Sequence, residues 1–121
     1  MHERNVTILL FAPDRATRQL YARALGNRWQ VIAVEQSQDV LTTLAANQVQ
    51  AVVLEPGPSD NQGWELLAKV REQAATSGIP IIMCSAVDER GKGYALGASA
   101  YLVKPVPPHQ LVNEVARWLE A

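Results

Sequence analysis

Apolar residues gather in five short runs along the chain, separated by longer stretches whose apolar positions have helical spacing. Within each run the apolar residues are consecutive rather than alternating, which is typical of strands in a parallel sheet covered on both faces. The runs occupy residues 6–11, 31–34, 51–54, 79–84 and 101–103. The pattern therefore predicts five strands that are buried on both sides.

The intervening stretches carry signals for helix ends. Asp14 is a favoured residue type at a helix amino terminus, and Gly26-Asn27 is typical of a helix end, so we expect the first helix between them. Ser37 or Asp39 can begin the second helix. These signals place one helix after each of the first two predicted strands.

Three later stretches complete the helical pattern. Apolar positions over residues 64–70 and 111–119 recur at helical spacing, and the first of these helices should end before residue 78. Between them, residues 87–96 contain Gly91 and Gly93, each of which lowers helix propensity by about 1 kcal/mol relative to Ala. We therefore expect the fourth helix to be short and mobile.

Five strands alternating with five helices predict an α/β domain of three layers, a doubly wound parallel sheet with right-handed crossovers. In such sheets the working site lies beyond the carboxyl ends of the strands, where the strand order reverses. The residues that follow the predicted strands are therefore the first candidates for a site: Ala12, Pro13, Glu55, Ser85 and Lys104.

Composition narrows the possible functions. The chain has 121 residues, so we expect one domain over residues 1–121. Lys and Arg number 11 and Asp and Glu 12, and a formal net charge of -1 offers no basic surface for nucleic acid or an anionic membrane. No membrane span or signal peptide is apparent, so a cytoplasmic location is expected. The single cysteine, Cys84, excludes a disulfide framework and reads as an inert core residue.

Three motifs follow the predicted strands in a recognisable order. Glu55 follows the third run, and Gly63 comes eight residues later. The fourth run, in IPIIMCSA, leads into Ser85. The fifth, in GASAYLVKP, contains Tyr101 and leads into Lys104 and Pro105.

Over essentially the whole chain, these motifs resemble the receiver domain of bacterial response regulators, which histidine kinases phosphorylate on aspartate. The resemblance implies a flavodoxin-like (CheY-like) fold, in which Glu55 holds the phosphoacceptor position. It also implies that Ser85 and Tyr101 hold the coupled switch positions, beside the lysine-proline pair of Lys104 and Pro105. Because a domain of this size takes up the given residues, we expect no output domain in the chain.

The sequence departs from the family at the metal site. Family members carry an acidic pair that holds Mg²⁺ after the first strand, and Ala12 and Pro13 occupy those positions here. Asp14 could supply one metal ligand or cap the first helix, and we favour the cap. Because Mg²⁺ needs several oxygen ligands in near-octahedral geometry, we expect its binding to be lost or weak. No other cofactor or metal is expected.

Glu55 has two interpretations, which do not exclude each other. It can act as a built-in mimic of the phosphorylated residue, or it can form a structural ion pair with Lys104 that ties the third strand to the fifth. Without a phosphoryl group, Ser85 and Tyr101 are expected to be frozen in one arrangement. For Tyr101 we slightly favour a half-buried aromatic on an edge strand.

These observations favour a degenerate receiver, or pseudo-receiver, that acts in signal transduction by protein–protein contact without phosphorylation. Its expected partner is a protein, such as a histidine kinase or an output domain, and we expect a monomer or weak dimer. Two alternatives remain: phosphorylation with a modified chemistry at Glu55 or Ser85, and a small-ligand module. An enzyme is least expected, because no nucleophile–base pair can be placed.

Overall fold

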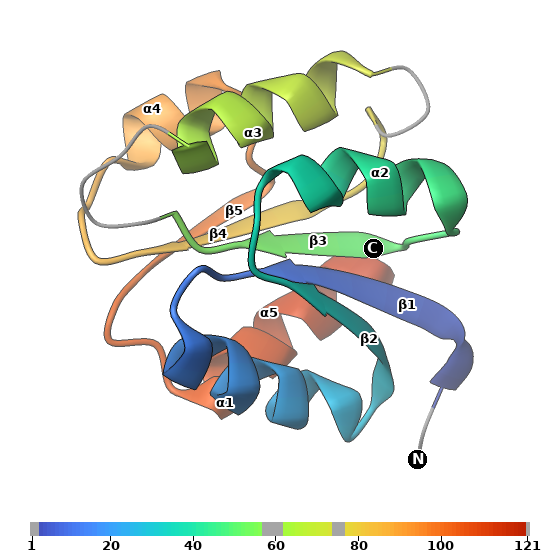
Figure 1. Ribbon diagram of the computed structural model, residues 1–121. Helices are drawn as coiled ribbons and strands as arrows, with labels where there is room; N and C mark the ends of the chain where they lie inside the picture. Colours follow the sequence, from blue (N-terminus) through green and yellow to red (C-terminus); the bar gives the residue numbers. More distant parts are fainter. Residues whose placement is uncertain (1–2, 57–61, 74–76, 121) are drawn as a thin grey trace.

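The computed structural model describes residues 3–56, 62–73 and 77–120. Its five strands form one parallel sheet in the order β2-β1-β3-β4-β5, which is the flavodoxin-like order (Figure 1). The strands are β1 (Glu3–Phe11), β2 (Trp29–Val34), β3 (Ala51–Leu54), β4 (Ile81–Ser85) and β5 (Ala100–Val103). The predicted fold class is confirmed.

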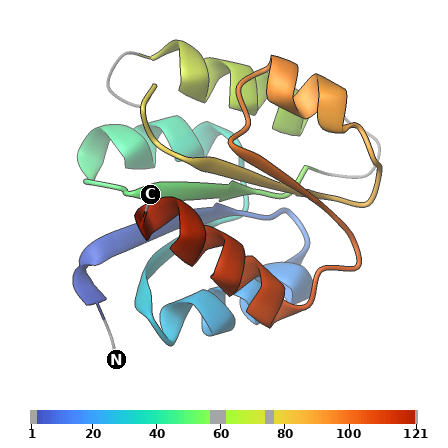
Figure 2. The same cartoon turned by 180° about the vertical axis from the view of Figure 1, so that it is seen from behind.

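Five helices cover the two faces of this sheet in the described part of the chain. They are α1 (Arg15–Gly26), α2 (Gln38–Ala46), α3 (Gln62–Glu72), α4 (Arg90–Ala95) and α5 (Pro108–Glu120). Helices α1 and α5 lie on one face, and α2, α3 and α4 lie on the other (Figures 1 and 2). The carboxyl ends of the strands point to the left of Figure 1, and the two ends of the chain lie toward the right.

Most predicted element bounds agree with the structure to within a few residues. The first strand begins at Glu3 rather than at residue 6, and the fourth begins at Ile81 rather than at residue 79. Pro80 has no N–H to donate to a sheet, and the carbonyl of Ile79 accepts a hydrogen bond from Arg71 instead of a strand. The apolar run therefore starts before the strand does.

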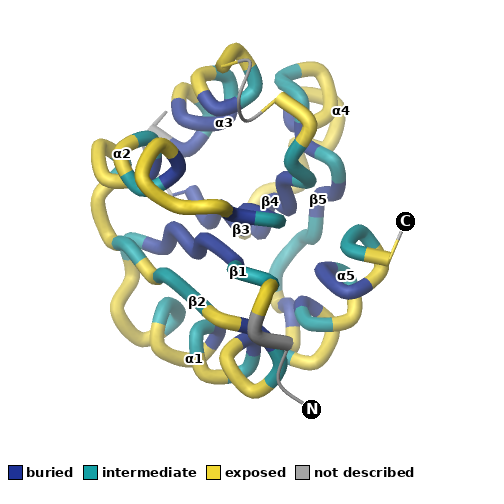
Figure 3. The backbone as a smooth tube through the Cα atoms, turned by 90° about the vertical axis from the view of Figure 1, so that its right-hand side faces the viewer, coloured by how far each residue is buried: buried dark blue, intermediate teal, exposed yellow. Residues whose placement is uncertain are grey.

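The core confirms that the central strands are covered on both sides. Every residue of β3 and β4 is buried, as is β1 from Ile8 onward (Figure 3). Alternate side chains of β1 enter different clusters: Ile8 and Leu10 pack with α1 and α5, whereas Leu9 and Phe11 pack with α2 and α3. This two-sided burial explains the continuous apolar runs in the sequence.

Asp14 caps the first helix, as predicted. Its Oδ2 atom accepts hydrogen bonds from the Thr17 N–H at 2.8 Å and from the Thr17 hydroxyl at 2.7 Å. These two bonds lower the pKa of Asp14 from its ordinary value, because they favour the charged carboxylate. The Asp14 carboxylate is therefore committed to starting α1.

Helix α4 has six residues, so the expectation of a short fourth helix is confirmed. Its two glycines differ in their surroundings. A Cβ atom at Gly91 would meet nothing within 4 Å, whereas one at Gly93 would lie 2.6 Å from Cδ2 of Tyr101. Gly93 therefore lets the helix approach β5 closely.

Arg71, near the end of α3, ties that helix to the segments that lead into β4 and β5. Its guanidinium donates to the carbonyl of Gly97 at 2.9 Å, to that of Ile79 at 2.9 Å and to that of Ser77. It also reaches the hydroxyl of Ser99 at 3.3 Å. Burial lowers the pKa of Arg71, but a guanidinium remains charged, so these are charge-assisted hydrogen bonds.

We expect Arg71→Lys to lower the free energy of unfolding by about 1–3 kcal/mol, because an ammonium cannot reproduce the planar set of donors. Urea denaturation measures the change. Arg90→Lys is the matched control, because Arg90 is exposed and pairs only with Asp88 among the described residues. It should change the free energy by less than about 0.5 kcal/mol. Equal effects of the two substitutions would contradict the role of Arg71.

Candidate functional site

The side chains of Glu55 and Lys104 meet at the carboxyl ends of the strands, which form one edge of the sheet. Glu55 follows β3 and donates its backbone N–H to Phe11, while Lys104 follows β5 and donates its own to Ser85. Nζ of Lys104 lies 2.8 Å from Oε1 of Glu55, and the side chains are 26% and 7% exposed. Since β4 lies between β3 and β5, the pair spans three strands of the sheet.

The second carboxylate oxygen of Glu55 is unsatisfied. Oε2 is buried and has no hydrogen-bond partner in the described part of the chain. A buried acceptor without a donor costs free energy, so this atom is an available acceptor at the edge of the sheet. The pair as a whole carries about zero net charge, because one carboxylate faces one ammonium.

Gly63 has a steric reason for its place eight residues after Glu55. A Cβ atom at Gly63 would lie 2.3 Å from Cβ of Pro56, a distance that real contacts do not reach. The first turn of α3 therefore packs directly on the residue that follows Glu55. The spacing reflects this contact and the course of the chain after β3.

The positions of the acidic pair offer no side-chain oxygen. Ala12 is buried, and Pro13 is partly buried. Their carbonyl oxygens accept hydrogen bonds from Nη1 of Arg18, at 2.8 Å and 3.3 Å. Arg18 also lies 3.9 Å from Glu35. The Arg18 guanidinium thus binds the backbone carbonyl oxygens at the end of β1, a contact that no pattern in the sequence indicated.

The described side chains do not match the needs of Mg²⁺. Asp14 is bound to Thr17 as a cap, and Oε1 of Glu55 faces Lys104. Over residues 3–56, 62–73 and 77–120, no three His, Cys, Asp or Glu side chains are grouped as a metal site would require. Mg²⁺ prefers several oxygen ligands in a regular octahedron, and this edge presents one unpaired carboxylate oxygen.

Ser85 and Tyr101 both bind the loop that leads from β4 to α4. Oγ of Ser85 accepts the N–H of Val87 at 3.2 Å. The Tyr101 hydroxyl donates to the Val87 carbonyl at 2.6 Å and accepts the N–H of Glu89 at 3.3 Å. Neither hydroxyl bonds to Oε2 of Glu55, which has no partner among residues 3–56, 62–73 and 77–120.

Tyr101 is more buried than expected. We expected a half-buried aromatic on an edge strand, but its exposed fraction is 5%, although β5 is an edge strand. Two neighbours distant in sequence explain the difference. The Trp64 ring stacks on the Tyr101 ring with centroids 6.2 Å apart, and Gly93 leaves space on α4.

Pro105 follows Lys104 through a cis peptide bond and lies exposed beside the site. The structure thus gathers Glu55, Ser85 and Lys104 at the carboxyl ends of the strands, and the Tyr101 side chain packs on the face of the sheet that α2 and α3 cover. Ala12, Pro13 and Asp14 lie at the end of the neighbouring strand β1.

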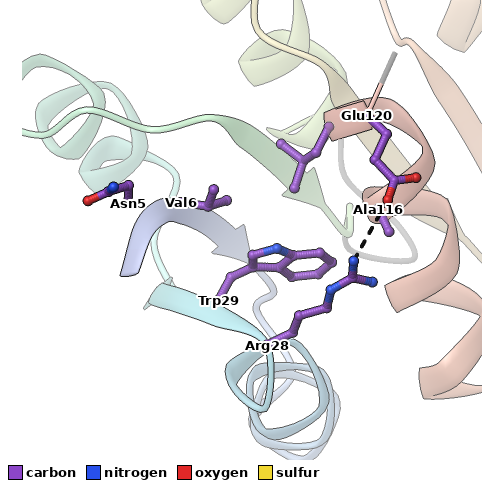
Figure 4. Close-up of a pocket in the computed structure, with 7 residues that line it drawn as sticks. Asn5, Val6, Arg28, Trp29, Ala116 and Glu120 are labelled. Atoms are coloured by element: carbon purple, nitrogen blue, oxygen red, sulfur yellow. Dashed lines mark ion pairs between the residues drawn. The ribbon is translucent and has the colours of Figure 1, made fainter. Parts of the chain in front are cut away.

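A pocket of about 350 Å³ lies at the other end of the molecule, between the start of β1 and the end of α5 (Figure 4). Arg28 lines it, with Cζ 5.0 Å from the centre of the Trp29 ring and Nη2 3.9 Å from Oε1 of Glu120. The pocket is therefore remote from Glu55 and does not supply the strand-end crevice expected of a small-ligand module. Within the described residues, no helix is long and apolar enough to cross a bilayer.

The Cys84 thiol and the Tyr21 hydroxyl are two buried groups that keep their protons. Burial raises the pKa of the Cys84 thiol to about 12, since the thiolate would lose its hydration. Burial also raises the pKa of Tyr21 to about 12, and its hydroxyl donates to the Val106 carbonyl at 3.1 Å. Both groups are therefore protonated at neutral pH, and the predicted place of Cys84 in the core is confirmed.

The family model of the response regulator receiver domain matches residues 8–116. The chain belongs to this family. Receiver domains act in two-component signalling, where they interact with histidine kinases and output domains.

This receiver domain is 28% identical over 113 residues to the transcriptional regulatory protein GltR of Pseudomonas aeruginosa, covering 90% of this chain and 47% of that protein. It is 31% identical over 115 residues to the alginate biosynthesis transcriptional regulatory protein AlgB of Pseudomonas syringae, covering 93% and 26%. The chain thus spans about half or less of the length of these relatives.

Solved receiver structures share the fold. A chemotaxis response regulator of Vibrio cholerae has a TM-score of 0.85 at 21% identity, with 93% of this chain and 98% of that chain covered. A response regulator from Thermotoga maritima has a TM-score of 0.82 at 19% identity, with 96% and 98% covered. At such identities the likeness shows the fold alone.

The ion pair gives a clear stability prediction. Lys104→Met leaves the Glu55 carboxylate buried without its cation, and we expect the free energy of unfolding to fall by about 2–4 kcal/mol. The double variant Glu55→Leu/Lys104→Met removes both charges and should recover most of this loss. Urea denaturation of the wild type, both single variants and the double variant measures the coupling. A Lys104→Met variant as stable as the wild type would contradict it.

The raised pKa values of Cys84 and Tyr21 predict that the protein loses stability at alkaline pH. The ordinary pKa values of Cys84 and Tyr21 are 9.0 and 10.0, and both rise to about 12 in the folded protein. The folded state therefore holds protons that the unfolded state releases, so their contribution is complete below about pH 9 and is lost as the pH rises toward 12. Urea denaturation between these pH values measures the fall. Cys84→Ala should make it shallower, and an unchanged slope would count against this origin.

Proposed function

We propose that this protein is a degenerate receiver domain that is not phosphorylated and signals by protein–protein contact from one fixed conformation. Its partner is a protein, such as a histidine kinase or an output domain. It acts in the cytoplasm as a monomer or weak dimer, without binding nucleic acid or a membrane. It is not an enzyme, and its binding of Mg²⁺ is lost or weak.

The observation that carries the proposal is the Glu55–Lys104 contact of 2.8 Å beside Ala12 and Pro13. A phosphoryl group in transfer needs a metal ion or several cations to neutralise its charge. At this edge Lys104 already faces a carboxylate, and the two positions at the end of β1 carry no acid. The local charge balance supports a site that does not attract a divalent cation.

The arrangement of the switch residues supports a fixed, on-like state. By resemblance to the family, the aromatic at the Tyr101 position swings inward when the domain is active. Here Tyr101 is buried, and its hydroxyl binds the loop before α4. Glu55 also places a permanent charge at the phosphoacceptor position, although one carboxylate carries less charge than a phosphoryl group.

One observation favours a second candidate, phosphorylation of Glu55 itself. The Oε2 atom has no partner among the described residues, so it retains a lone pair for attack. In that reaction, Oε2 would attack the phosphorus of an acyl phosphate donor. The bond from phosphorus to the leaving carboxylate would break, and a mixed anhydride would form on Glu55.

Two measurements separate these candidates. Incubation with acetyl phosphate and Mg²⁺, followed by intact-mass measurement, should give no added phosphoryl group. Titration with Mg²⁺ and beryllofluoride to millimolar concentration should leave the backbone amide shifts around Glu55 unchanged.

A matched variant shows that the assay can detect the chemistry. Ala12→Asp/Pro13→Asp/Glu55→Asp restores the carboxylates of the family and should bind Mg²⁺ and gain one phosphoryl group. A gain of mass in the wild type, or saturable shifts at Glu55, would overturn the proposal in favour of the second candidate.

A further inference from the structure

The loop between β4 and α4 is pinned by two hydroxyl groups. The N–H of Val87 binds Oγ of Ser85, and its carbonyl binds the hydroxyl of Tyr101. The N–H of Glu89 also binds the Tyr101 hydroxyl. Because both backbone polar groups of Val87 are held inward, its side chain stands in solvent, 50% exposed.

The Tyr101 ring is itself held from two other elements. Trp64 of α3 stacks on it with an angle of 12° between the rings, and Nζ of Lys92 lies 4.6 Å from the centre of the Trp64 ring. Stacked aromatic rings and a cation over a ring face each stabilise the packing beyond what the buried area alone contributes. These contacts join α3, α4 and β5 around one side chain.

Gly93 sets the space for this ring. A Cβ atom there would lie 2.6 Å from Cδ2 and 3.0 Å from Cε2 of Tyr101, so any larger residue must displace the ring or the helix. Tyr94, the next residue, is 50% exposed. The position of α4 on β5, and with it the exposed Tyr94, therefore depends on the inward Tyr101.

No hydrogen bond of the described residues joins this cluster to the Glu55 carboxylate. Glu55 pairs with Lys104 through Oε1, and Oε2 has no partner. The hydroxyls of Ser85 and Tyr101 bind the loop backbone. The inward ring is thus held by its own neighbours.

We propose that Trp64, Gly93 and Tyr101 form an aromatic latch that holds the β4–α4 loop, with Val87 and Tyr94 exposed, independently of the charge at Glu55. The inference rests on the proposed function in one respect: a receiver that is not phosphorylated needs another means of fixing its contact surface. The latch is that means. Trp64 and Gly93 are positioning residues, which act through Tyr101.

Gly93→Ala tests the latch, with Gly91→Ala as its matched control on the same helix. In Gly93→Ala, the nuclear Overhauser contacts between the Trp64 and Tyr101 rings should disappear, and amide exchange at Glu89 should accelerate by about five-fold or more. In Gly91→Ala both should stay as in the wild type, because a Cβ there meets nothing within 4 Å. Ring contacts and exchange that are the same in both variants would overturn the proposal.

Tyr101→Phe serves if Gly93→Ala does not fold, because it removes the hydroxyl and keeps the ring. Faster exchange at Glu89 is expected, and an unchanged rate would overturn the role of the hydroxyl.

Glu55→Gln tests the independence of the latch. The Trp64–Tyr101 contacts and the exchange rate at Glu89 should persist in this variant, and their loss would show that the charge controls the latch. These outcomes are separable from the proposed function. A mass gain with acetyl phosphate defeats that function whatever Gly93→Ala does, whereas an intact latch in Gly93→Ala defeats only this inference.

Discussion

Burial of β3, of β4 and of β1 from Ile8 onward is the constraint on which the rest of the structure depends. Because the side chains on both faces of these segments are apolar, polar groups are excluded from them and collect where the strands end. Parallel strands end at one common edge, so Glu55, Ser85 and Lys104 come together although they are far apart in the chain. The same burial makes the edge sensitive to charge, since a carboxylate there has little water to stabilise it and needs Lys104.

Two kinds of interaction meet at this edge and differ in what they control. The Glu55–Lys104 pair sets the electrostatics of the site and ties β3 to β5 across β4. The packing of Trp64 and Gly93 around Tyr101 sets the course of the backbone between β4 and α4. The Glu55–Lys104 pair acts through charge, whereas the packing around Tyr101 acts through the shapes of the side chains. A receiver that has lost its acidic pair can therefore still present a defined surface.

The sequence predicted the parts of the fold that depend on local pattern. Consecutive apolar residues located the strands, and the Asp14 cap located the first helix, because burial and capping act over a few neighbouring residues. The order of motifs at the strand ends gave the family. What the sequence could not predict depends on contacts between distant residues. The burial of Tyr101 requires Trp64 and Gly93, and a glycine at position 93 indicates by itself only a weak helix propensity. Arg18 and Arg71 bind backbone carbonyls, and such acceptors cannot be located from the pattern of side chains in the sequence.

The buried position of Glu55 has a consequence for how information reaches this protein. A phosphorylated aspartate reports on an upstream enzyme, because its charge comes and goes. The charge at Glu55 is encoded in the gene, and its burial beside Lys104 shields it from salt. Under the proposed function, each molecule is therefore in the same signalling state from the moment it folds. What the cell can vary is the number of copies, so synthesis and degradation would take the place that kinase and phosphatase hold elsewhere in the family.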